Sequence, residues 1–306
     1  MTLTELRYIV AVAREKHFGH AAEACFVSQP TLSVAVKKLE EELDVKLFER
    51  GASEVSMTPI GEAIVRQAQS VIEQAAAIKE IAKRGKDPLD GPLRMGIIYT
   101  IGPYLLPELV KHAIAQMPQM PLMLQENFTV KLLEMLRTGE LDCAIMAEPF
   151  PDAGLAIAAL YDEPFLVAVP AQHALARRKR ISAEELKQET MLLLGTGHCF
   201  RDHVLEVCPE FARFASDAEG IRKSFEGSSL ETIRYMVASG MGVTVVPQLS
   251  APKERQEHIR YIPFEAPVPT RRVVLAWRRS FTRYEAIAAL RNAVCACSLE
   301  GVKRLS

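Results

Sequence analysis

The sequence predicts an α/β chain in which a helical N-terminal part precedes a larger part built from strands and helices. In the first 85 residues, apolar side chains recur every three or four positions, which is typical of amphipathic helices. From Leu93 onward, short apolar runs alternate with helical stretches, a pattern that indicates a parallel α/β architecture. The segment GKDPLDGP at 85–92 separates the two parts and has the composition of a linker. A length of 306 residues suits about two domains.

Composition excludes several classes of protein. The formal net charge is −1, with 37 Lys and Arg against 38 Asp and Glu, so bulk positive charge cannot supply an affinity for nucleic acid. The sequence shows no run of 18 apolar residues and no secretory pattern at its start, so we expect a cytoplasmic protein without a membrane partner. In a reducing compartment the six cysteines should be free thiols, and a disulfide would act as a signal.

The N-terminal module is expected to hold three helices and a wing. A first helix at 5–14 places Leu6, Ile9, Val10 and Ala13 on one face, and a short second helix surrounds Ala21. Ser28 is the expected N-cap of a third helix, whose inward side chains recur at helical spacing. Those inward residues are Leu32, Val36, Leu39 and Leu43.

The outward face of this third helix carries short polar side chains that can meet base edges and phosphates, as in a recognition helix in the major groove. Val45–Phe48 and Val55–Met57 would form the wing around Arg50 and Gly51. The alternative is a small helical domain with a solvated face, since residues 1–90 carry 14 acidic and 12 basic side chains. The predicted DNA contacts are Gln29, Pro30, Thr31, Ser33, Val34, Lys37 and Arg50.

A long helix should follow, with Thr58 as its cap, Pro59 at its first position and Gly85 past its end. Ile64, Val71 and Ile78 repeat every seven positions, and an alanine lies four residues after each of them. This spacing predicts a dimerisation seam, and packing on the chain's own N-terminal module is the alternative. The predicted seam consists of Ile64, Ala68, Val71, Ala75 and Ile78.

Two segments carry a resemblance to a known family. They are HFGHAAEACFVSQPTLSVAVKKLEEELDVKLFER and MTPIGEAIV, and both resemble the winged helix-turn-helix of LysR-type transcriptional regulators. The resemblance continues over the whole chain. It implies a winged helix-turn-helix at 1–58, a linker helix and hinge at 59–90, and a regulatory domain at 91–306. That domain would resemble a periplasmic binding protein, with one α/β subdomain at about 91–163 and 268–306 and another at about 164–267.

Four further segments resemble the peroxide-sensing members of this family: GPYLLP, the LDC that ends at Cys143, GHCFRDHVLEVC and SLETIRYMVASGMGVTVVP. The resemblance implies a transcriptional activator that binds promoter operators in double-stranded DNA, forms a homodimer or homotetramer and engages RNA polymerase. Hydrogen peroxide would be its signal, Cys199 the peroxidatic residue and Cys208 the resolving one. The implied peroxide-binding residues are Thr100, Thr129, His198, Asp202 and Arg271, with Arg272 as the alternative to Arg271.

Cys199 follows an apolar strand and is expected to begin a helix. The helix N-terminus and the neighbouring His198, Arg201 and His203 should favour its thiolate, which attacks peroxide to give a sulfenic acid. Nine helical steps to Cys208 span about 13.5 Å. A disulfide needs Cα atoms roughly 4.4–6.8 Å apart, so a helix and a disulfide over this segment exclude each other.

Other interpretations stay open at this point. The two cysteines could be unrelated buried residues, or His198, Cys199, His203 and Cys208 could bind zinc. The protein could instead sense a small organic effector between its subdomains, with incidental cysteines. A thiol peroxidase or a solute-binding protein is a third class, which the winged helix and the missing export signal disfavour. We expect no cofactor, no metal and no turnover enzyme, and structural roles for Cys25, Cys143, Cys295 and Cys297.

Overall fold

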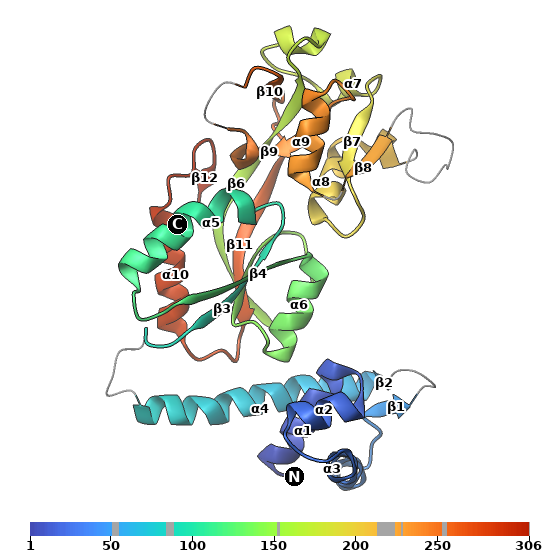
Figure 1. The fold of residues 1–306 in the computed structure, drawn as a ribbon, viewed down its shortest axis with the longest axis vertical. Coiled ribbons are helices and arrows are strands. Elements are labelled where there is room, and N and C mark those ends of the chain that lie inside the picture. The colour runs from blue at the N-terminus through green and yellow to red at the C-terminus, as the bar shows by residue number, and fades with distance from the viewer. Residues whose placement is uncertain are drawn as a thin grey trace.

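The computed structural model describes residues 1–50, 55–83, 89–151, 154–212, 224–227, 229–252 and 256–305. It shows an N-terminal module, a linker helix that runs beside it and an α/β domain from Leu93 onward (Figure 1). The predicted wing tip at Gly51, the side chain of Arg50 and the first linker residues, 85–88, lie outside the described part of the chain.

The N-terminal module has the predicted elements, namely α1 (Leu3–Glu15), α2 (Phe18–Ala24) and α3 (Gln29–Leu43), followed by the antiparallel wing strands β1 (Phe48–Arg50) and β2 (Val55–Met57). The Ser28 hydroxyl accepts a hydrogen bond from the Thr31 amide at 3.4 Å, which confirms it as the cap of α3. Leu32, Val36 and Leu39 are buried beneath this helix as predicted.

The linker helix α4 (Pro59–Lys83) begins at Thr58, whose hydroxyl accepts from the Gly61 amide at 2.9 Å. Its first turns pack back onto the N-terminal module. Ala68 is buried in the core of that module, and Ile64 and Val71 pack partly against it. Ile78, by contrast, is 68% exposed. The first half of the predicted seam therefore contacts its own domain, and dimerisation through the second half stays a prediction.

The main sheet of the α/β domain has the strand order β10-β6-β11-β5-β3-β4. β3 (Leu93–Ile98) is parallel to β4 (Leu122–Asn127) and to β5 (Cys143–Ala147). β11 (Thr270–Arg278) is antiparallel to β5 and to β6 (Leu155–Pro170), and β10 (Ile259–Pro263) is antiparallel to β6. The expectation of a parallel sheet is therefore wrong for half of it, because β11 returns between two strands without a crossover helix.

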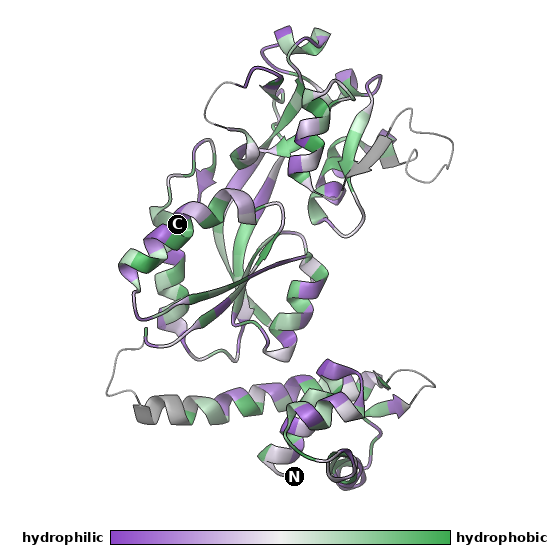
Figure 2. Ribbon diagram, in the orientation of Figure 1, coloured by the Kyte–Doolittle hydropathy of each residue, from purple (hydrophilic) through white to green (hydrophobic). Residues whose placement is uncertain are grey.

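Two apolar cores lie along β6, one on each side of Glu163. The first lies beneath α5 (Gly102–Gln116), α6 (Thr129–Thr138) and α10 (Tyr284–Ala296). The second involves α7 (Ala183–Leu186), α8 (Cys199–Val207) and α9 (Leu230–Ala238) with β7 (Met191–Leu194) and β9 (Thr244–Pro247). β8 (Ser224–Gly227) pairs in parallel with β7. β6 passes through both (Figure 1), and Figure 2 shows hydrophilic residues where β6 and β11 run between the two cores. The short elements are η1 (Ala174–Arg177), η2 (Pro209–Ala212), η3 (Gln248–Ser250) and β12 (Lys303–Arg304).

Among the helices that the structure describes, none combines the length and the hydropathy needed to cross a membrane.

An ion pair joins the linker helix to the α/β domain. Glu73 on α4 contacts the Arg278 guanidinium at 2.5 Å, and its second oxygen accepts from the Ser280 hydroxyl at 2.5 Å. Arg278 is buried at the end of β11 and also donates to the backbone carbonyls of Leu136 and Leu141. Because burial of a guanidinium is costly without a counter-charge, the carboxylate of Glu73 stabilises this end of the domain.

We predict that Glu73→Ala lowers the free energy of unfolding by about 3 kcal/mol, because it leaves the Arg278 charge buried without its carboxylate. Urea denaturation of the full chain measures the effect. The matched control is Glu62→Ala on the exposed first turn of the same helix, which should change the value by less than about 0.5 kcal/mol. Equal midpoints for the two variants would contradict the prediction.

Candidate functional site

A small cavity lies where β3, β4 and β7 end. Thr100 follows β3, Thr129 begins α6 after β4, and Cys199 begins α8 after β7. The carboxyl ends of such strands are where ligands bind in α/β sheets, and two helix N-termini add their positive dipole ends here. The cavity has room for about one water-sized molecule. Its lining is Ile98, Tyr99, Thr100, Asn127, Phe128, Thr129, Gly197, His198 and Cys199.

Arg271 lies behind this cavity and organises it. Its side chain is buried, and its Nη1 and Nη2 donate to the hydroxyl and the carbonyl of Thr100 at 2.8 and 2.9 Å. Its guanidinium carbon lies 5.1 Å from the centre of the Phe200 ring. Arg272 instead points outward and pairs with Asp162 at 2.8 Å. The structure therefore brings Arg271, and not Arg272, to the candidate site.

Glu163 is a site residue that the sequence analysis missed. It is fully buried, accepts from Arg271 Nε at 2.9 Å and accepts from the Leu249 amide at 2.8 Å. The signal was present as an acidic residue within the apolar stretch AALYDEPFLVAV. A buried carboxylate requires a partner, so this position should have been paired with a buried cation.

The charge state of Cys199 differs from the expectation of a resting thiolate. The residue packs partly against the first apolar core, and this burial raises the pKa of its thiol above the ordinary value. The Thr129 hydroxyl and the Arg271 charge lower that pKa, but they do not outweigh desolvation. The expectation is therefore wrong in its net direction, and the resting form is a thiol beside groups that favour its ionised form.

Thr129 and His198 complete the polar lining. The Thr129 hydroxyl is buried and lacks a hydrogen-bond partner of normal geometry within the described residues. The same hydroxyl lies near enough to Cys199 to lower the pKa of its thiol, so a small polar ligand beside the sulfur would also be within reach of Thr129. His198 is buried as well, with its ring 4.9 Å from that of Phe128 and 5.9 Å from that of Tyr99.

Three other candidates lie apart from the cavity. Asp202 is exposed and does not line it, so its role in peroxide binding stays a prediction. Arg201 is buried and donates to the Leu194 carbonyl at 2.9 Å. His203 lies 2.8 Å from the Glu148 carbonyl, and burial lowers the pKa of its imidazole. His203 is thus a neutral anchor of α8, and the expected cationic contribution to Cys199 is wrong for this residue.

Cys208 lies at the opposite end of α8 from Cys199, as the helical spacing predicts. It is fully buried in the second core, its amide donates to the Val204 carbonyl at 2.9 Å, and burial raises the pKa of its thiol to about 12. Both cysteines are free thiols. With about 13.5 Å of helix between them, a disulfide requires α8 to unfold.

The zinc alternative is not supported by the placement of its ligands. A metal site would need at least three ligand atoms close together. Among the described residues, three such atoms lie within 4.8 Å of one another at Glu108, His112 and Cys297. The four residues of the zinc alternative, at and around α8, do not form such a group.

The predicted DNA contacts lie together on the N-terminal module. Gln29, Pro30, Thr31, Val34 and Lys37 are exposed on α3, and Ser33 is half-buried. The analysis missed Phe26, which lies in the turn before α3, is 96% exposed and has a positive φ of 56°. A large aromatic side chain in open solvent beside a recognition helix suggests contact with a partner, and no polar or periodic signal marked it in the sequence.

Comparison with known proteins gives consistent relatives for both parts. Residues 3–62 match the model of bacterial regulatory helix-turn-helix proteins of the lysR family, and residues 86–296 match the LysR substrate binding domain. The hydrogen peroxide-inducible genes activator of Pectobacterium carotovorum is 39% identical over 94% of this chain and 95% of its own. The transcriptional dual regulator OxyR of Escherichia coli K12 is 38% identical over 94% of both chains.

Solved structures agree with these matches. Full-length OxyR from Pseudomonas aeruginosa, with a cysteine-to-aspartate substitution, is 52% identical, has a TM-score of 0.81 and covers 97% of this chain and 96% of its own. A cysteine-to-serine mutant of Corynebacterium glutamicum OxyR with bound hydrogen peroxide is 33% identical, with a TM-score of 0.63 over 96% and 91% of the two chains.

We predict that alkylation of Cys199 by iodoacetamide speeds up about tenfold per pH unit from pH 7 to beyond pH 8.5, because burial raises its pKa and only the thiolate reacts. Thr129→Val should shift this profile to still higher pH, since it removes a group that lowers the pKa. Peptide mass spectrometry measures each cysteine separately, and the exposed Cys295 is the internal control. A rate that levels off below about pH 8.5 would disprove the raised pKa.

Proposed function

The chain belongs to the LysR family of bacterial transcriptional regulators, and we propose that within it the protein is a transcription factor switched by hydrogen peroxide. One observation carries the proposal. The Cys199 thiol shares a cavity of about one water-sized molecule with the Thr129 hydroxyl, which lies close enough to lower the pKa of that thiol. The space suits a ligand close to water in size and is far too small for the organic effector of the alternative hypothesis.

In the first chemical step, Cys199 sulfur attacks one oxygen of hydrogen peroxide and the O–O bond breaks. The thiol proton goes to the departing hydroxide, so a sulfenic acid and one water form. In this proposal Thr129 and Thr100 bond the peroxide oxygens. Arg271 supports this role, because it fixes Thr100 and lowers the pKa of the attacking thiol. The resting Cys199 is a thiol, so the two threonines and Arg271 assist the reaction only once peroxide occupies the cavity.

In the second step, Cys208 sulfur attacks the sulfenic sulfur, an S–S bond forms and a second water leaves. Two thiols are oxidised and one peroxide is reduced to two waters. The step requires α8 to unfold, which removes its packing on the second core and the contact between His203 and the Glu148 carbonyl. The protein therefore consumes peroxide once per switching event and is not an enzyme.

The DNA-binding face on α3 and the exposed end of α4 support a further part of the proposal. The protein binds operator DNA as a homodimer or homotetramer, because one module with nearly balanced charge gives too little affinity. Refolding of α8 would change how the subunits pack against one another. The footprint of the protein on DNA and its contact with RNA polymerase would change as a result. A cytoplasmic location suits this mechanism, since a reversible disulfide reports oxidation only where reduction is the resting state.

We predict that one equivalent of peroxide produces a 199–208 disulfide in the wild type, with the mass of two hydrogen atoms lost from the intact protein. Cys199→Ser should give none, and Cys208→Ser should stop at a sulfenic acid that a dimedone probe captures. Cys143→Ser is the control, because that thiol is buried in the first core. A peroxide-dependent change of DNase footprint in Cys199→Ser would refute the proposal.

We predict that Thr31→Ala or Gln29→Ala weakens operator binding by about 1–3 kcal/mol at fixed salt, with less effect on random DNA, because these side chains read base edges. Lys37→Ala should weaken both and reduce the slope of affinity against salt by about one. Fluorescence anisotropy measures both, with Lys111→Ala on the exposed face of α5 as the control. Unchanged specificity in the first two variants would contradict this assignment of α3.

We predict that Ile78→Asp reduces the mass of the assembly in sedimentation experiments, because it charges the exposed end of the seam. Gln74→Asp, on an exposed position of the same helix, is the control. An unchanged mass for Ile78→Asp would place the dimer contact elsewhere.

A further inference from the structure

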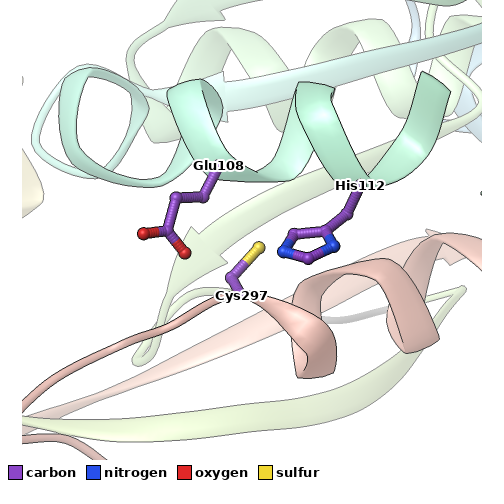
Figure 3. A group of neighbouring side chains, drawn as sticks. All are labelled: Glu108, His112 and Cys297. Carbon is purple, nitrogen blue, oxygen red and sulfur yellow. The ribbon is translucent and has the colours of Figure 1, made fainter. Parts of the chain in front are cut away.

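A second cluster of reactive side chains lies on the far helices of the first subdomain and plays no part in the mechanism above. Glu108 and His112 stand one turn apart on α5, and Cys297 follows the last residue of α10. Their ligand atoms all lie within 4.8 Å of one another. In Figure 3 the Cys297 sulfur lies between the Glu108 carboxylate and the His112 ring.

We propose that Glu108, His112 and Cys297 form a binding site for a divalent transition metal of the zinc type. Carboxylate oxygen, imidazole nitrogen and thiolate sulfur are the donors that such an ion takes, and three protein ligands leave a fourth position for water. Glu108 and His112 are half-buried, which leaves room for that water, whereas Cys297 is fully buried.

The geometry requires only small movements. Tetrahedral ligands at zinc distances lie about 3.3–3.6 Å apart, so three groups within 4.8 Å need a modest contraction. Glu108 and His112 differ by four positions on one helix, which puts both side chains on the same face. The carboxylate is already oriented, because its second oxygen accepts from the Ser298 amide at 2.5 Å.

The charges and protons also balance. Cys297 now donates its thiol proton to the Ala293 carbonyl at 3.3 Å, and metal binding releases that proton to solvent. The resulting thiolate and the Glu108 carboxylate carry two negative charges, which a divalent cation neutralises with neutral imidazole as third ligand.

Arg304 fixes the end of α10 that carries the sulfur. Its guanidinium donates to the backbone carbonyls of Cys295 and Cys297, so the position of Cys297 beside α5 is held by the fold itself.

The experiment titrates the reduced full-length chain with Co²⁺, a spectroscopic substitute for Zn²⁺, and then displaces it with Zn²⁺. We expect one Co²⁺ per chain with a thiolate-to-cobalt charge-transfer band, and Zn²⁺ should remove this band. Cys297→Ser should abolish the band, and His112→Asn should weaken binding at least about tenfold. Cys295→Ser, two positions away and exposed, should keep both.

A Cys199→Ser, Cys208→Ser double variant separates this site from a zinc site on α8 and from the peroxide switch. We expect it to bind Co²⁺ like the wild type while it no longer responds to peroxide. Absence of a stoichiometric band in the wild type, or a band that persists in Cys297→Ser, overturns the proposal. Far-ultraviolet circular dichroism confirms that Cys297→Ser folds, and release of one proton per Zn²⁺ bound by the wild type provides a readout independent of that variant.

Discussion

The buried ion pair between Arg271 and Glu163 is the interaction on which the candidate site depends. Both side chains are 1% exposed, and their closest atoms are 2.8 Å apart. Desolvation of two charges is costly, so such a pair persists only where further hydrogen bonds satisfy it. Here Thr100 and the Leu249 amide provide those bonds. One pair of charges thus ties β11, β6 and the loop before α5 together behind the cavity.

This arrangement explains how an unreactive resting thiol can still be specific for a small oxidant. Burial keeps Cys199 protonated, and Arg271 and Thr129 oppose that effect without outweighing it. A general rise in thiol reactivity would expose the protein to many electrophiles. A cavity with room for about one water-sized molecule slows bulkier reagents and favours an oxidant that fits and that brings its own hydrogen-bonding oxygens.

The sequence predicted most of the fold because its elements are marked by local patterns. The periodicity of α3, the cap at Ser28 and the apolar runs of β3, β5 and β7 all depend on residues near one another in the chain. It did not predict that β6 continues through Pro164, since proline normally interrupts a strand and only pairing with β11 shows its place. Glu163 and the net pKa of Cys199 depend on burial, which long-range packing decides. Long-range packing also forms the cluster of Glu108, His112 and Cys297. Cys297 lies more than 180 positions after the other two, so no local pattern in the sequence indicates the cluster.

Glu73 joins the linker helix α4 to the α/β domain at one point. A small rotation of the helix about this point would move its distant end by a larger distance. Glu73 lies 14 residues from Pro59, a distance of about 21 Å along the helix axis, and the N-terminal module packs along the helix up to Ile72 from its Pro59 end. A tilt of about 10° around Glu73 would displace that end by about 3.6 Å, close to the rise of one base pair. A rearrangement too small to disturb the sheet could therefore move α3 from one base-pair step of an operator to the next.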